Sequence, residues 1–121
     1  MKKYIKGSRV SNIFEDYTKN DGLADIVSET DKILGRYKKF EYISWDFDDN
    51  SEMLRLYIEL NPDMYKDIPE DYQYVELAYH YYDFEDAIKS FKSRNDVLEA
   101  AKQLVSTIKY DINRELSGIR Y

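Results

Sequence analysis

Residues 42–60 read YISWDFDDNSEMLRLYIEL, and this stretch decides the fold. Apolar and polar side chains alternate along both halves of it, and a polar cluster at residues 48–51 separates the halves. A period of two is typical of strands that bury one face, and a short polar cluster between two such runs is typical of a turn. The stretch therefore predicts a β-hairpin whose buried face carries Ile43, Trp45, Phe47, Leu54, Leu56, Ile58 and Leu60.

A third alternating run follows at residues 74–81. One side of this run carries Val75, Leu77, Tyr79 and Tyr81, and the other side carries Tyr74, Glu76, Ala78 and His80. Residues 61–71 contain both prolines and are predicted to form a loop or a single helical turn. The three runs together predict a three-stranded antiparallel sheet.

The hydrophobic period is helical on both flanks of this region. Before it, apolar residues at helical spacing predict helices over about residues 9–19 and 23–34. After it, an apolar stripe begins at Phe84, and residues 93–96 have the composition of a capping cluster for a long helix that runs to about Ser117. The order ααβββαα predicts a single α+β domain over residues 1–121, with the sheet packed against helices. Its core is expected to contain Phe14, Ile26, Ile33, Trp45, Leu56, Ile58, Val75, Leu77, Ile88, Leu104 and Ile108.

Acidic residues are concentrated in the predicted sheet region. Residues 41–86 contain fourteen acidic and two basic side chains, a net charge of −12, whereas the whole chain carries −6. The same segment contains eight of the 13 tyrosines. If helices cover one face of the sheet, the opposite face exposes Tyr42, Asp46, Arg55, Tyr57, Glu59, Tyr74, Glu76 and His80.

We expect this region to bind a basic partner protein, because tyrosine is enriched at interface hot spots and carboxylates complement a basic surface. The candidate partner-binding residues are Tyr42, Asp46, Asp48, Asp49, Glu52, Tyr57, Glu59, Glu70, Asp71, Tyr74 and Glu76. The alternative is that they form only a solvated surface, since tyrosine also favours strands for its own reasons. Direct binding of nucleic acid is not expected, because that function normally goes with a basic balance of charge.

The sequence offers little catalytic chemistry. It contains no cysteine and a single histidine, His80, which excludes thiolate sites and two-histidine metal sites. Residues 46–50 begin like a calcium loop, but Ser51 then replaces the expected glycine and Tyr57 the final glutamate. No phosphate-binding glycine-rich loop, dinucleotide fingerprint or nucleophile elbow is present. We therefore expect no enzyme activity, no cofactor and no metal site.

The chain is expected to be cytoplasmic and to make no contact with a membrane. No stretch of it approaches the roughly 18 apolar residues that a membrane-spanning helix needs. The basic N-terminus is not followed by an apolar run of signal-peptide length. The absence of cysteine agrees with a reducing compartment.

In overall character the chain resembles the small, acidic, cysteine-free inhibitors that phages and mobile elements encode against bacterial defence nucleases, anti-CRISPR proteins among them. The features behind the resemblance are its length of 121 residues, the acidic segment 41–86 and the lack of catalytic motifs. The resemblance implies an inhibitor that occupies a basic nucleic-acid channel or a neighbouring domain of a CRISPR or other defence nuclease, in some members by mimicking DNA. Two alternatives share these features, namely an immunity protein that neutralises a cognate toxin and a phage structural or regulatory subunit.

Overall fold

The computed structural model describes residues 21–118. Its elements are, in order, α2 (Asp21–Leu34), β1 (Phe40–Asp48), β2 (Met53–Leu60), the short 3₁₀ helix η1 (Glu70–Tyr72), β3 (Tyr74–His80), α3 (Tyr82–Lys89) and α4 (Arg94–Ser117). The predicted α+β fold with a three-stranded antiparallel sheet is confirmed. The helix predicted over residues 9–19, with Phe14 in it, lies outside the described residues. Within residues 21–118, no helix combines the length and the apolar character that crossing a membrane requires.

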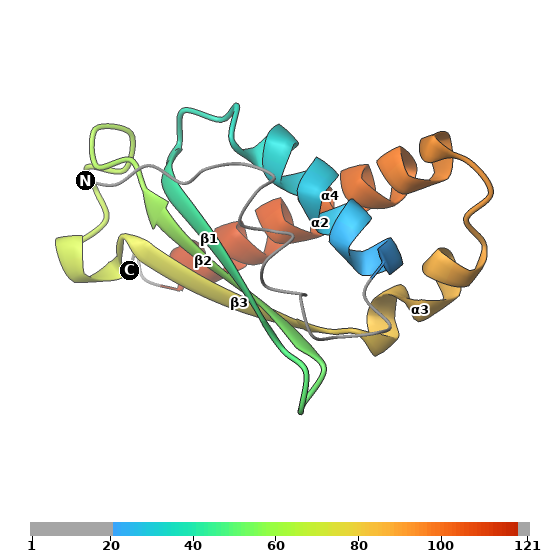
Figure 1. Cartoon of the computed structure of the whole chain (residues 1–121). Coiled ribbons are helices and arrows are strands. Elements are labelled where there is room, and N and C mark those ends of the chain that lie inside the picture. The colour runs from blue at the N-terminus through green and yellow to red at the C-terminus, as the bar shows by residue number, and fades with distance from the viewer. Residues whose placement is uncertain (1–20, 119–121) are drawn as a thin grey trace.

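The sheet has β2 at its centre, with β1 and β3 paired antiparallel on either side. Figure 1 shows α2 and α4 packed together against the sheet, while α3 continues from the end of β3. Alternate side chains are buried along β1 and β2, as expected when helices cover one face. The two faces of the sheet therefore differ in role, because one belongs to the core and the other carries the polar side chains.

The predicted alternation identifies the core face correctly. All seven apolar residues assigned to the buried face of the hairpin are at most 6% exposed. Four further core predictions are also buried, namely Ile26, Val75, Leu104 and Ile108. Three others are only partly buried and pack against the rim of the core, namely Ile33, Leu77 and Ile88. Leu77 on the edge strand β3 is less covered than its cross-strand neighbour Leu56 on the central strand.

A buried hydrogen bond fixes α2 to the sheet. The indole Nε1 of Trp45 on β1 donates to Oδ1 of Asp31 on α2 at 3.0 Å, and both side chains are buried. A buried indole N–H without an acceptor would cost folding free energy, and the carboxylate provides that acceptor. This bond therefore sets the position of α2 along β1.

A second hydrogen bond ties β3 to α4. The hydroxyl of Tyr79 donates to Oδ2 of Asp111 at 2.7 Å. Burial of the ring, the hydrogen bond to Asp111 and the negative charge of that carboxylate all raise the pKa of the Tyr79 phenol far above its ordinary value. The phenol therefore remains a donor over the whole neutral range of pH.

An ion pair of Glu29 with Arg94 connects α2 to the start of α4, and Lys32 on α2 itself shares the Glu29 carboxylate. Oε2 of Glu29 lies 2.7 Å from Nη2 of Arg94 and 3.3 Å from Nζ of Lys32. Burial alone would raise the pKa of Glu29, but the hydrogen bonds from Lys32 and Arg94 outweigh it and lower that pKa. The predicted capping cluster is confirmed beside this contact, because Asp96 accepts the backbone N–H groups of Lys92 and Ser93.

Gly22 marks a close contact between α2 and α3. A Cβ added there would overlap Cγ2 of Ile88 and would lie 2.9 Å from its Cγ1. We expect Gly22→Ala to lower the free energy of unfolding by about 1–2 kcal/mol, because overpacking costs up to about 3 kcal/mol and the helix propensity of alanine returns only about 1 kcal/mol. Urea unfolding of the two proteins measures this difference.

The double variant Gly22→Ala/Ile88→Ala provides the control for Gly22. In the Ile88→Ala background both γ carbons that approach position 22 most closely are gone and only the 3.2 Å approach to Cβ remains, so most of the loss caused by the alanine at position 22 should disappear. A Gly22→Ala variant that is more stable than the original protein would show that α3 can move aside without cost.

Candidate partner-binding face

The face of the sheet opposite α2 and α4 carries the candidate site. We call it the open face, and its side chains are Tyr42, Ser44, Asp46, Arg55, Tyr57, Glu59, Tyr74, Glu76, Ala78 and His80. Cross-strand pairing arranges them in rows: Tyr42–Glu59–Tyr74, then Ser44–Tyr57–Glu76, then Asp46–Arg55–Ala78. Each row crosses all three strands, so side chains far apart in sequence become direct neighbours.

Tyr57 lies at the centre of the open face. Its ring stacks on that of Tyr74, with the ring centroids 5.9 Å apart and the planes inclined by 24°. Partial burial raises the pKa of the Tyr57 phenol, and the surrounding groups Glu59, Tyr74, Glu76 and Tyr42 raise it further. Tyr57 is therefore a neutral, partly desolvated aromatic ring in a negative environment, which is the kind of group that anchors interfaces.

The charge of the open face is predominantly negative. Asp46, Glu59 and Glu76 contribute three carboxylates, and Arg55, which lies across from Asp46, contributes the one guanidinium. A shallow hollow of about 330 Å³ opens between them over the small residues Ser44 and Ala78. Asp46, Glu76 and the Arg55 guanidinium all line this hollow, together with the Tyr57 ring.

A β-bulge adds Glu41 to the rim of the open face. Phe40 pairs with Leu60 but Tyr42 pairs with Glu59, so Glu41 is an extra residue in β1. Strict alternation would place Glu41 on the helix side together with Ile43. In the structure Glu41 is exposed and lines a cavity with Glu59 and Tyr74. Glu41 is not among the predicted site residues, because the alternation of apolar and polar residues along a strand does not reveal a bulge.

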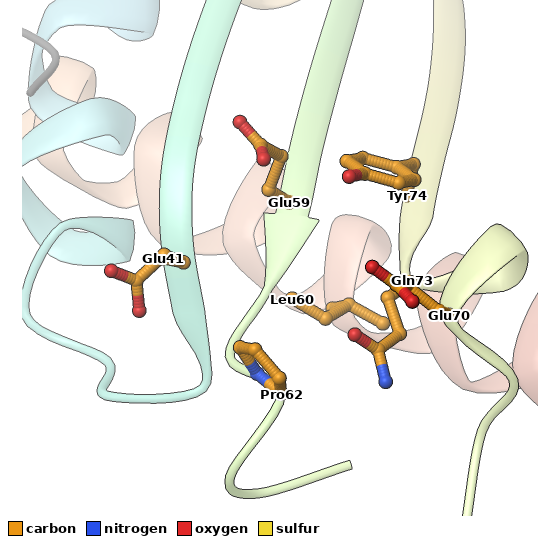
Figure 2. A pocket seen from close by; sticks show the side chains of 7 residues that line it. All are labelled: Glu41, Glu59, Leu60, Pro62, Glu70, Gln73 and Tyr74. Carbon is orange, nitrogen blue, oxygen red and sulfur yellow. The ribbon is translucent and has the colours of Figure 1, made fainter. Parts of the chain in front are cut away.

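Figure 2 shows this cavity at the end of the sheet where β1 and β2 meet residues 61–73, the connection from β2 to β3 that contains both prolines and that we call the proline loop. Its volume is about 300 Å³, and Glu70 and Gln73 line it from the loop side. The Gln73 amide holds the loop in place by donating to the carbonyl oxygens of Tyr65 at 3.3 Å and Ile68 at 3.0 Å. The loop thus brings Glu70 next to the open face.

The hairpin tip carries three of the predicted residues. Oδ1 of Asp48 accepts the backbone N–H groups of Asn50 at 3.0 Å and Ser51 at 3.4 Å. The Ser51 side chain and these backbone N–H groups lower the pKa of Asp48. Asp49 is exposed, and Glu52 adopts a positive φ of 55°. Asp48 therefore shapes the turn, which confirms that residues 48–51 form a hairpin turn.

The eleven predicted residues do not form one cluster. Six share the open face, namely Tyr42, Asp46, Tyr57, Glu59, Tyr74 and Glu76. Glu70 adjoins it at one end, and Asp71 is exposed on the same 3₁₀ helix. Asp48, Asp49 and Glu52 lie at the other end, roughly 25 Å away along the strands at about 3.3 Å per residue. A partner that contacts all of them must therefore extend along the whole sheet.

His80 lies at the end of the open face, across from Met53, and is exposed. Among residues 21–118, no three His, Cys, Asp or Glu side chains are grouped closely enough to hold a metal ion. The open face thus combines aromatic rings, three carboxylates and one guanidinium around a shallow hollow.

Comparison of the chain with protein-family models, with curated proteins and with solved structures gave no match.

Proposed function

We propose that this protein is an inhibitor that binds a basic partner protein through its open face, and that the partner is a bacterial defence nuclease that processes nucleic acid. The observation that carries the proposal is the stack of Tyr57 on Tyr74, surrounded by the carboxylates of Asp46, Glu59 and Glu76. Aromatic anchors give a docked complex its lifetime, whereas a negative potential steers a basic partner into place. The open face combines both groups on one rigid sheet.

Inhibition would follow from occupation of the nuclease channel. Such a channel is lined by Lys and Arg side chains that neutralise phosphates, so carboxylates placed there compete with nucleic acid and release the same counterions. The open face, extended by Glu41 and Glu70 at one end and by Asp49 at the other, runs the length of the sheet. No chemical step by this protein is needed, and in this proposal it is not an enzyme.

The test uses two baits of equal net charge. The first carries Glu59→Lys and Glu76→Lys on the open face. The control carries Asp86→Lys on α3 and Glu115→Lys on α4, two exposed positions away from the open face. We expect the unchanged protein and the control to retain the same basic nuclease from a bacterial lysate and to inhibit it. The open-face variant should bind it about 100-fold more weakly or worse, since like charges at an interface cost several kcal/mol.

Association rates at two salt concentrations complete this test. Binding of the unchanged protein should slow as salt rises, because screening shortens the reach of exposed charges to about 8 Å at physiological ionic strength. If the control variant loses the partner while the open-face variant keeps it, the interface lies on the helices and the proposal is wrong. A retained toxin in place of a defence nuclease would identify an immunity protein.

A further inference from the structure

Among residues 21–118, no strand pairs with the outer edge of β3, which presents a regular row of backbone groups. The backbone N–H of Leu60 donates to the carbonyl of Gln73 at 2.8 Å, and that of Tyr81 donates to the carbonyl of Glu52 at 2.8 Å. In an antiparallel pair, residues alternate between bonding to the neighbouring strand and pointing away from it. The odd-numbered residues of β3 therefore bond to β2. The backbone groups that point outward belong to Tyr74, Glu76, Ala78 and His80.

As far as residues 21–118 show, this edge lacks several of the features that prevent strand addition, although Glu76 places one charge on it. Such features include proline, lysine, bulges and a covering element. The seven residues of β3 contain neither proline nor lysine, and their register with β2 is unbroken from Tyr74 to His80. β1, the other edge, is interrupted by the bulge at Glu41. Within residues 21–118, no strand pairs with the outer side of β3, which forms one margin of the sheet in Figure 1.

The two sides of this edge differ in chemistry. The residues of β3 whose backbone groups point outward have their side chains on the open face. The side chains of Tyr74 and Glu76 would therefore lie beside any added strand. On the helix side, Leu77 and Tyr79 are only partly covered. Tyr79 also lines a groove of about 270 Å³ whose other walls include Phe84 and Ala87 of α3 and Leu104 of α4. An added strand would therefore meet carboxylate and aromatic groups on one face and apolar groups on the other.

We propose that the β3 edge captures an extended segment of the basic partner as a fourth, antiparallel strand, in which Lys or Arg alternates with aliphatic residues. Main-chain hydrogen bonds to the edge hold such a segment. Its side chains alternately contact the open face and the helix side of the sheet, and these contacts give specificity. The Lys or Arg opposite Glu76 lies on the open face, and the next residue along packs against Leu77 on the helix side. The proposal rests on the proposed function, from which it takes the positive charge of the partner. It adds that the partner is bound through backbone hydrogen bonds to β3.

The first test follows amide hydrogen exchange by NMR while a capped heptapeptide of alternating lysine and valine is added to the full chain. Without peptide, the amides of Val75, Leu77 and Tyr79 should already be protected by β2. With peptide at 100 times its Kd, the outward amides of Tyr74, Glu76, Ala78 and His80 should slow by about 100-fold. A peptide of equal composition with its three valines adjacent should not protect them. Equal protection by both peptides, or none by either, would overturn the proposal.

The second test removes one outward donor from the edge. Ala78→Pro deletes an N–H that β2 does not use, a substitution that edge strands tolerate. Ala78→Thr keeps the N–H and serves as the matched control. The proline variant, shown to be folded by circular dichroism, should bind the alternating peptide at least about tenfold more weakly than the threonine variant. Equal binding by these two variants would overturn strand addition. If the proline variant does not fold, the amide exchange of the unchanged protein with the two peptides decides by itself whether a strand adds to β3.

The outcomes separate this inference from the function on which it rests. If Glu76→Lys abolishes binding of the partner protein while Ala78→Pro binds it like Ala78→Thr, the open face is the interface and strand addition is wrong. If neither variant affects the partner, the proposed function itself fails. A homodimer in the absence of peptide, with the four outward amides already protected, would show that a second copy of the chain occupies the edge, and would also overturn the proposal.

Discussion

Replacing Trp45 with alanine should lower the free energy of unfolding by about 3–5 kcal/mol, which is a large fraction of the 5–15 kcal/mol that typical domains possess. The substitution empties a large volume at the centre of β1. It also removes the indole N–H from which Asp31 accepts a hydrogen bond. Trp45→Phe separates the two effects, because it keeps an aromatic ring in the core but loses the indole N–H. That variant should lose about 1–3 kcal/mol, mostly from the hydrogen bond to the buried carboxylate.

Urea unfolding followed by circular dichroism measures these losses. Ile43→Val is the control, because it lies on the same face of the same strand, has no polar partner and should cost only about 0.5–1.5 kcal/mol. A Trp45→Phe variant as stable as the unchanged protein would contradict the importance that we give to the bond between β1 and α2.

Replacing Tyr57 with alanine should raise the dissociation rate of the partner complex by roughly 30- to 1000-fold, as expected for a hot-spot residue worth about 2–4 kcal/mol. Tyr57 is the central ring of the open face and stacks on Tyr74, so its loss removes the anchor and loosens its neighbour. The association rate should change little, since long-range steering comes from the carboxylates. Surface plasmon resonance at two salt concentrations separates the two rates.

Two variants serve as controls for Tyr57. Tyr57→Phe keeps the stacked ring and should retain most of the complex lifetime. Tyr82→Ala removes an even more exposed tyrosine, 79% accessible on α3, and should leave both rates unchanged. If Tyr82→Ala is as damaging as Tyr57→Ala, the anchor lies at the start of α3 and not on the open face.

The two-residue alternation of apolar and polar side chains was sufficient to predict the sheet, because a strand that buries one face must alternate apolar and polar residues. Ile43, Trp45 and Phe47 are buried as predicted, and the polar residues between them face away. The same rule does not extend to Glu41, which a bulge inserts as an extra residue before the alternating run. A bulge depends on the pairing of two strands, so it cannot be recognised in either strand alone.

Long-range contacts explain what else the sequence could not predict. Asp31 interrupts the apolar stripe of α2, and its role becomes evident only when Trp45, 14 residues later, is folded onto it. The separation of Asp49 from Glu70 likewise depends on how the hairpin and the proline loop emerge from opposite ends of β2. The sequence therefore allowed most of the open-face residues to be identified. It also predicted that all candidate residues form one surface, whereas the fold divides them into a central face and two ends.

The position of Trp45 makes the protein its own fluorescent reporter of folding. It is the only tryptophan, and it is buried on the helix side of β1 beside a carboxylate. The open face, by contrast, carries tyrosines. Tryptophan emission should therefore follow the detachment of α2 from the sheet and should respond little to binding on the open face. A single titration of the unlabelled chain can thus distinguish a variant that unfolds from one that only fails to bind.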